Sequence, residues 1–121
     1  DGQADGDTSH VFTVNFRRTV SSITSISLLF QGGFVPEECQ FYTIPSTNDS
    51  AGSSGKSVIW NEIKDAYIEP ENENTMQEFD LTECEDQQLL KNCTGVRFVF
   101  RSSTDFYGRI ILYKLEVHGE E

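Results

Sequence analysis

Cysteine is scarce in this chain of 121 residues, which contains only Cys39, Cys84 and Cys93. An odd number of cysteines cannot pair completely, and no two of them have the CxxC spacing of zinc or redox sites. The sequence therefore predicts no disulfide framework, no metal and no cofactor. Unpaired cysteines favour a reducing intracellular compartment. Secretion is the alternative, because Asn48 and Asn92 begin glycosylation triplets.

Basic side chains are also few. Nine lysines and arginines stand against twenty aspartates and glutamates, which gives a formal net charge of −11. Nucleic-acid affinity comes largely from neutralising phosphates with basic side chains. The negative electrostatic field of this chain therefore argues against nucleic acid as a direct partner. No apolar run approaches the roughly 20 residues that cross a bilayer, so we expect no membrane span.

Catalytic motifs are missing as well. The acidic residues between 69 and 85 fall in turn-like segments, where carboxylates are usually just solvated. The calcium-loop-like opening at Asp1 reaches Phe12 where the metal needs a glutamate, and residues 52–57 are too short for a phosphate-binding loop. The sequence predicts no enzyme and no catalytic residue.

Aromatic residues, in contrast, are plentiful, with nine phenylalanines, four tyrosines and one tryptophan. Apolar and polar residues alternate in several short segments, which is the period of a half-buried strand. A polar connection is expected at residues 17–22, and a short helical turn within 82–92. The segment 58–68 also suits a helix, although we favour a strand. The predicted strands are 10–16, 23–30, 39–44, 58–68, 76–81, 96–101 and 109–118.

Short strands separated by turn residues indicate an all-β sandwich or barrel. The length suits one domain. We expect residues 1–9 to be an acidic loop or tail and residues 10–121 to form a single domain. Within it, residues 45–57 are almost wholly small and polar, which predicts a flexible loop.

The connection between the last two predicted strands carries the candidate binding residues. Phe106 and Tyr107 are adjacent aromatics that either plug the end of the fold or form an aromatic rim for a partner. In the second interpretation Asp105 and Arg109 are polar anchors. Phe34, which follows a glycine pair, either joins the rim or caps the core.

Two stretches resemble a known family. They are residues 28–34 (LLFQGGF) and residues 104–120 (TDFYGRIILYKLEVHGE). They are similar to the nuclear receptor 2C2-associated protein family, whose single domain resembles the discoidin domain, also called coagulation-factor type C or galactose-binding-like. The likeness runs from about Ser9 to the end of the chain and is loose between residues 36 and 90.

The resemblance implies a jelly-roll β-sandwich of about eight strands, with the first strand missing here because residues 10–16 align with a strand inside the domain. It also implies a non-catalytic protein-binding adaptor, similar to a nuclear repressor of receptor-driven transcription. The expected partner is then a nuclear receptor, in the nucleus and cytoplasm. Calcium-binding relatives place a glutamate where this chain has Lys114, so the expectation of no metal stands.

The rival hypothesis is a carbohydrate-binding module of a secreted or cell-surface protein. It rests on the two glycosylation triplets, on Trp60 and on the aromatic rim, since aromatic faces stack on sugar rings. A disulfide between Cys84 and Cys93 would favour it.

Overall fold

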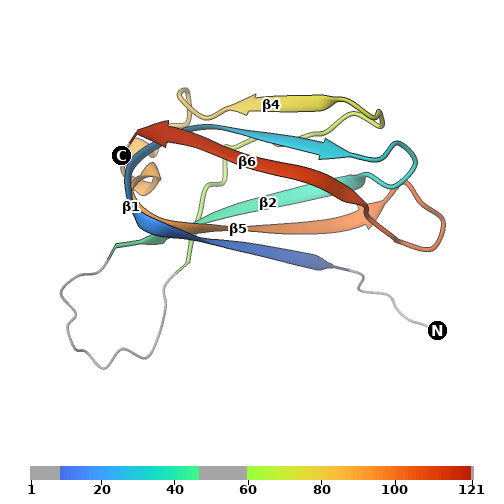
Figure 1. The fold of residues 1–121 in the computed structure, drawn as a ribbon, viewed down its shortest axis with the longest axis horizontal. Coiled ribbons are helices and arrows are strands. Elements are labelled where there is room, and N and C mark those ends of the chain that lie inside the picture. The colour runs from blue at the N-terminus through green and yellow to red at the C-terminus, as the bar shows by residue number, and fades with distance from the viewer. Residues whose placement is uncertain (1–8, 47–59, 121) are drawn as a thin grey trace.

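The computed structural model describes residues 9–46 and 60–120, which form an antiparallel β-sheet that curls over on itself (Figure 1). The described part contains no α-helix, so the all-β prediction is confirmed. No helix in it is long and apolar enough to cross a membrane. Its elements are β1 (His10–Phe30), β2 (Pro36–Pro45), β3 (Asn61–Glu62), β4 (Met76–Asp80), the short 3₁₀ helix η2 (Gln87–Leu90), β5 (Lys91–Ser103) and β6 (Leu112–Glu120).

Strand β1 belongs to both layers of the curled sheet. The strands follow the order β3-β2-β5-β1-β4, and β6 also pairs with β1. The first half of β1 pairs with β5, whereas its second half lies between β4 and β6. One layer therefore contains β3, β2, β5 and the start of β1, and the other contains β4, β6 and the end of β1 (Figure 1).

The predicted polar connection at 17–22 is wrong, because β1 continues through it. Asn15 lies opposite Gly95 and Val20 opposite Cys93, so β1 advances five residues while β5 advances two. Extra residues of this kind form a β-bulge, which bends a strand without ending it. The bulge therefore lets one continuous strand pass from one layer to the other.

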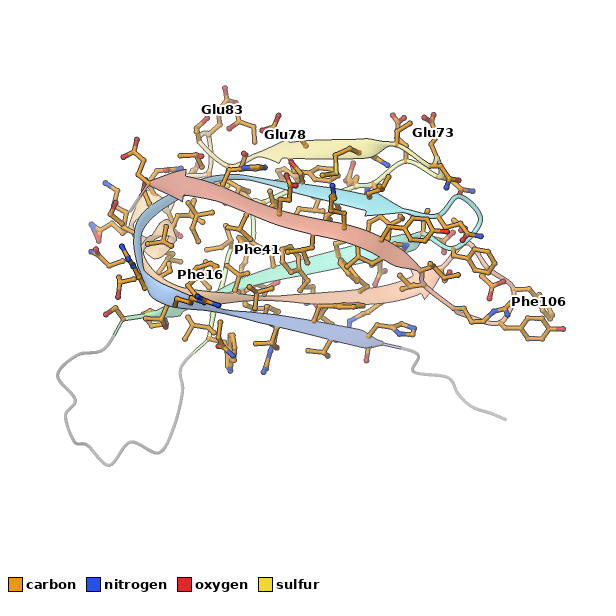
Figure 2. All side chains as sticks on the ribbon, viewed as in Figure 1. Phe16, Phe41, Glu73, Glu78, Glu83 and Phe106 are labelled. Atoms are coloured by element: carbon orange, nitrogen blue, oxygen red, sulfur yellow. The ribbon has the colours of Figure 1, made fainter. Side chains whose placement is uncertain are left out.

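The core lies between the two layers and follows the predicted alternation. Ile26, Leu28 and Phe30 are fully buried, as are Phe98 and Phe100. Figure 2 shows Phe41 pointing into the same space from β2. Each fully buried phenylalanine contributes roughly 1.5–3 kcal/mol of hydrophobic free energy, as buried leucines and isoleucines do, so this aromatic cluster is a substantial part of the core.

The predicted strand at 58–68 is mostly wrong, and so is its helical alternative. Only Asn61–Glu62 forms a strand, and residues 58–59 lie outside the described part. The segment then covers the core as an irregular chain in which Ile63 and Ile68 are buried. Its apolar residues reflect burial of a loop rather than a regular period.

The last strand lies closer to the C-terminus than the predicted range of 109–118. The strand is Leu112–Glu120, and Tyr113 is 57% exposed. Leu29 pairs with Lys114 whereas Phe30 pairs with Leu112, so Tyr113 is the extra residue of a bulge. This bulge turns Leu112 toward the core in its place.

The remaining predictions fare better. The strands at 39–44, 76–81 and 96–101 fall on β2, β4 and β5, and the helical turn corresponds to η2. Asp86 precedes that turn, and its side chain makes no capping hydrogen bond. The predicted tail at 1–9 and loop at 45–57 lie almost entirely outside the described residues.

Candidate functional site

Two connections lie side by side at one end of the curled sheet, away from the bend of β1 (Figure 1). One is the tip loop, defined as residues 104–111 between β5 and β6, and the other is residues 31–35 between β1 and β2. The backbone N–H of Thr104 donates to the carbonyl of Val35 at 2.9 Å, and the N–H of Val35 donates to the Thr104 hydroxyl at 3.1 Å. The two connections therefore form one surface.

Phe34 is brought to the base of the tip loop by the same kind of pairing. The N–H of Ile111 donates to the carbonyl of Phe34 at 3.1 Å, and the N–H of Gln31 donates to the carbonyl of Ile111 at 2.9 Å. Phe34 is half-buried. The backbone thus fixes this ring next to residues more than seventy positions later in the sequence.

Asp105 organises the tip loop. One of its carboxylate oxygens accepts hydrogen bonds from the backbone N–H groups of Tyr107 (3.1 Å) and Arg109 (3.0 Å). Its two oxygens also accept from Nε (2.9 Å) and Nη2 (3.1 Å) of the Arg109 side chain. Aspartates commonly close turns in this way, and the two-pronged ion pair adds geometric specificity. Residues 105–109 are therefore held in one conformation.

Gly108 completes the turn. Its backbone N–H donates to the carbonyl of Asp105 at 3.0 Å, and its φ angle is +78°. Residues with a side chain rarely adopt this conformation, whereas glycine does so freely. The sequence DFYGR thus contains both the acceptor and the flexible residue that the turn requires.

The turn presents two aromatic rings to solvent. Phe106 is 90% exposed and Tyr107 is 73% exposed. Their ring centroids are 5.1 Å apart and the rings are nearly perpendicular, the edge-to-face arrangement that aromatic pairs prefer. Figure 2 shows Phe106 projecting beyond the end of the sheet. The two rings therefore do not plug the end of the fold.

Arg109 links these rings to Phe34. Its guanidinium carbon lies 5.2 Å from the centroid of Phe34 and 5.3 Å from that of Tyr107, within cation–π range. The Arg109 side chain remains 61% exposed, whereas that of Asp105 is 10% exposed. All five predicted site residues thus lie together, and we call them the aromatic tip: Phe34, Asp105, Phe106, Tyr107 and Arg109.

The charge state of the aromatic tip follows from this geometry. The hydrogen bonds from the Arg109 side chain, assisted by the backbone N–H groups of Arg109 and Tyr107, lower the pKa of Asp105 to about 2. The carboxylate is therefore ionised at neutral pH and is matched by the neighbouring guanidinium. The aromatic tip is consequently close to neutral on a strongly acidic chain.

The structure adds neighbours that the sequence did not indicate. Nε2 of His10 lies 3.1 Å from the carbonyl oxygen of Gly108, across 98 positions of sequence. The side-chain carbonyls of Asn72 and Asn74 accept from the N–H groups of the glycine pair at 32–33, at 2.6 and 2.8 Å. Asparagine is common in turns, but nothing in the sequence shows which distant segment Asn72 and Asn74 will hold.

Metal-binding groups and thiols are two kinds of reactive group that could carry chemistry. In residues 9–46 and 60–120 no group of three His, Cys, Asp or Glu residues could hold a metal ion. The three cysteines are free, so the disulfide between Cys84 and Cys93 considered above is not formed. Burial raises the pKa of Cys39 to about 12 and, with the nearby Asp65, that of Cys84 to about 11. These thiols are poor nucleophiles.

Trp60 lies apart from the aromatic tip and is already engaged. The guanidinium carbon of Arg97 lies 3.7 Å from the centroid of the indole ring. Nε of the same arginine donates to the hydroxyl of Thr13 at 3.1 Å. A sugar ring could not stack on this face of the indole without displacing Arg97.

Taken together, the fold and the aromatic tip define an all-β curled sheet with an ordered, exposed aromatic surface at one end. The chain is a distant homologue of the nuclear receptor 2C2-associated proteins, as the resemblance predicted. It is 35% identical to the Danio rerio protein over 82% of this chain, and 35% identical to that of Xenopus tropicalis over 80%. The Homo sapiens protein is 28% identical over 98% of the chain.

The chain spans 57% of the length of the Danio rerio and Xenopus tropicalis relatives and 70% of the Homo sapiens relative. No family model matches the chain, and no solved structure matches it significantly.

Proposed function

We propose that this chain is a non-catalytic protein-binding domain that engages its partner through the aromatic tip. The observation that carries the proposal is the pair of exposed rings, Phe106 and Tyr107, on a loop fixed by Asp105. Aromatic and arginine side chains are enriched among the residues that contribute most to protein interfaces. A loop ordered before binding also loses little conformational entropy when the complex forms.

The homologues suggest the partner. They are named for association with nuclear receptor 2C2, and their names include no catalytic activity. We therefore propose a nuclear receptor as the partner, an adaptor role in repressing receptor-driven transcription, and residence in the nucleus and cytoplasm. Three free thiols are compatible with such a reducing compartment.

For the fold we propose the finer assignment of a discoidin-like jelly roll. Two facing antiparallel layers, with loops gathered at one end of the sheet, support it. That architecture would place the aromatic tip where related domains bind their ligands, while leaving the nature of the ligand open.

The test measures binding of the purified chain to the purified ligand-binding domain of nuclear receptor 2C2 by biolayer interferometry. Replacing both Phe106 and Tyr107 with alanine should weaken binding at least about 30-fold, the effect of losing a hot spot of about 2 kcal/mol. Tyr67→Ala is the matched control, because Tyr67 is 76% exposed but lies between β3 and β4. It should leave the affinity unchanged.

Two outcomes would overturn the proposal in different ways. Absence of binding by the unmodified chain would remove the receptor as the partner. Equal binding by the double variant would remove the aromatic tip as the interface.

Carbohydrate binding is the second candidate, because exposed rings also stack on sugars. A glycan array probed with the unmodified chain and with the double variant would reveal it. A defined glycan retained only by the unmodified chain would replace the protein-binding proposal.

A further inference from the structure

Tyr113 lies at the start of β6, just after the tip loop (Figure 1), and is not one of the five residues of the aromatic tip. In a regular strand its ring would point inward with Leu115 and Val117. The bulge at Tyr113 gives the inward place to Leu112 and leaves the Tyr113 ring 57% exposed. Bulges are over-represented next to functional sites, where they re-aim a side chain. The exposed ring therefore points to a contact outside the chain.

Gln31 holds the Tyr113 side chain against the base of the aromatic tip. The hydroxyl of Tyr113 donates to Oε1 of Gln31, across 82 positions of sequence. The carbonyl of Gln31 accepts the backbone N–H of Phe34 at 3.0 Å, and the N–H of Gln31 donates to the carbonyl of Ile111 at 2.9 Å. Tyr113 is therefore connected to the aromatic tip through Gln31 and, like the tip, is positioned before a partner binds.

The same contacts leave hydrogen-bond donors unused at this surface. Gln31 uses its side-chain oxygen for Tyr113, and its Nε2 donates no hydrogen bond to the described residues. Arg109 uses Nε and Nη2 for Asp105, and its Nη1 likewise donates to no residue in the described ranges. Amide and guanidinium nitrogens can only donate. The surface that contains Tyr113 and Tyr107 thus combines aromatic rings with available donors.

These donors suit a neutral oxygen better than a carboxylate. Asp105 already matches the charge of Arg109, so little net positive charge remains to attract an anion. The chain as a whole carries −11, and the exposed residues Glu71 and Glu73 lie in the segment that is bonded to the neighbouring glycine pair. A carboxylate on a partner would be repelled by this field, whereas a main-chain or amide carbonyl would not.

We propose that Tyr113 and Gln31 extend the aromatic tip and make it selective for a partner protein on which apolar side chains border a neutral carbonyl oxygen. The rings contact the apolar side chains, and Nε2 of Gln31 donates to the carbonyl. A partner without that acceptor would leave the donor desolvated and unpaired, which costs free energy. The inference rests on the proposed function, because it assigns the chemistry of the partner at the same surface.

The first measurement uses small probes and does not need the receptor. N-acetyl-leucine methylamide has an apolar side chain and neutral carbonyls, whereas N-acetyl-leucine ends in a carboxylate. In NMR titrations of the isotope-labelled full chain, we expect the methylamide to shift the backbone amides of Gln31 and Tyr113, with a dissociation constant in roughly the millimolar range that suits so small a ligand. The carboxylate probe should bind more weakly.

Gln31→Glu is the variant for these titrations, because it keeps an acceptor for the Tyr113 hydroxyl but loses the amide donors. The shifts caused by the methylamide should largely disappear in it. Absence of shifts in the unmodified chain, equal shifts in Gln31→Glu, or tighter binding of the carboxylate probe would each overturn the inference.

The second measurement repeats the receptor interferometry with the same variant. Gln31→Glu should weaken binding at least about tenfold, because the partner's carbonyl would face an acceptor in place of a donor. Tyr113→Phe frees the Gln31 side chain and should weaken binding about threefold, the effect of losing one modest hydrogen bond. Tyr67→Phe removes the hydroxyl of another exposed tyrosine and is the matched control, with no expected effect.

The outcomes separate this inference from the proposed function. Receptor binding that is lost in the Phe106 and Tyr107 double variant but unchanged in Gln31→Glu would overturn the inference and keep the proposed interface. Equal losses in Tyr113→Phe and Tyr67→Phe would remove the role of Tyr113. If the unmodified chain does not bind the receptor, the proposed partner fails, and the methylamide titration decides the inference by itself.

Discussion

The two ends of the curled sheet differ in what they expose. At the aromatic tip, side chains project from a closed turn, and the carboxylate of Asp105 satisfies the backbone groups within it. At the bend of β1 the side chains are partly buried, and the strand passes from one layer of the sheet to the other. The tip therefore offers exposed side chains to a partner, whereas the bend holds the two layers together.

The two ends also differ in how much they contribute to the stability of the fold. The rings of Phe106 and Tyr107 touch little of the core, so the fold does not require them. The bend, in contrast, contains the bulge that carries β1 between the layers and the end of the β1–β6 pairing. Changes at the bend should therefore lower the free energy of unfolding, and changes at the tip should mainly alter the loop.

Two glycines give the largest expected contrast. A Cβ added at Gly119 would lie 2.0 Å from the carbonyl oxygen of Ser22, so Gly119→Ala must separate β6 from β1. We expect a loss of about 3 kcal/mol or more in urea denaturation followed by circular dichroism. Gly108→Ala at the tip only strains a positive φ and should cost about 1–2 kcal/mol. Equal losses of unfolding free energy in the two variants would show that the bend is no more important for stability than the tip.

Acid should loosen the tip as Asp105 becomes protonated. The pKa of Asp105 is lowered to about 2 in the folded chain, against 3.8 without its partners. A lowered pKa means that the ionised form stabilises the loop above pH 4, and that this stabilisation is lost as the pH falls from about 4 to about 2. The NMR signals of the Tyr107 and Arg109 amides should shift over that range.

Asp105→Asn provides the control for the acid titration. It should abolish the shift at both amides, since no carboxylate remains at that position to protonate. The amides at the centre of β5, a strand without acidic residues, should be unaffected in the same experiment. A shift that persists in the variant would assign the transition to another carboxylate.

The cysteines give the smallest expected effect, a difference in alkylation rate between the two regions. Cys93 pairs with Val20 at the bend and is fully buried, whereas Cys39 pairs with Phe100 and is half-buried. With a pKa of about 12, roughly one Cys39 thiol in ten thousand is ionised at pH 8, so alkylation should be slow. Mass spectrometry after iodoacetamide treatment should show Cys93 reacting more slowly still. Faster reaction at Cys93 would show that the bend opens readily.

Sequence reasoning predicted the parts of the molecule that depend on local order. The alternation of Val96, Phe98 and Phe100 places them in the core because a strand points successive side chains to opposite faces. Asp105 and Arg109 are four positions apart, so one turn brings them together. Such features depend only on residues that are close together in the sequence.

The missed features depend on partners far away in the sequence. The bulges at residues 15–20 and at Tyr113 exist because β1 must match β5 and then β6. The contact of His10 with Gly108 requires the register of β1 against β5, which no local pattern contains. Arg17 and Arg18 looked like loop residues, and only the continuous strand places them at a groove.

The pairing of β1 with β5 also has a consequence for how the chain is made. His10 pairs with Phe100, ninety positions later, so the beginning of β1 cannot close its pairing until most of the chain has left the ribosome. At about 5–20 residues per second the β1 segment spends several seconds as an unpaired apolar strand. Pairings of such long range also fold slowly. During synthesis β1 is therefore exposed to misassembly, and a chaperone that covered it would protect the chain.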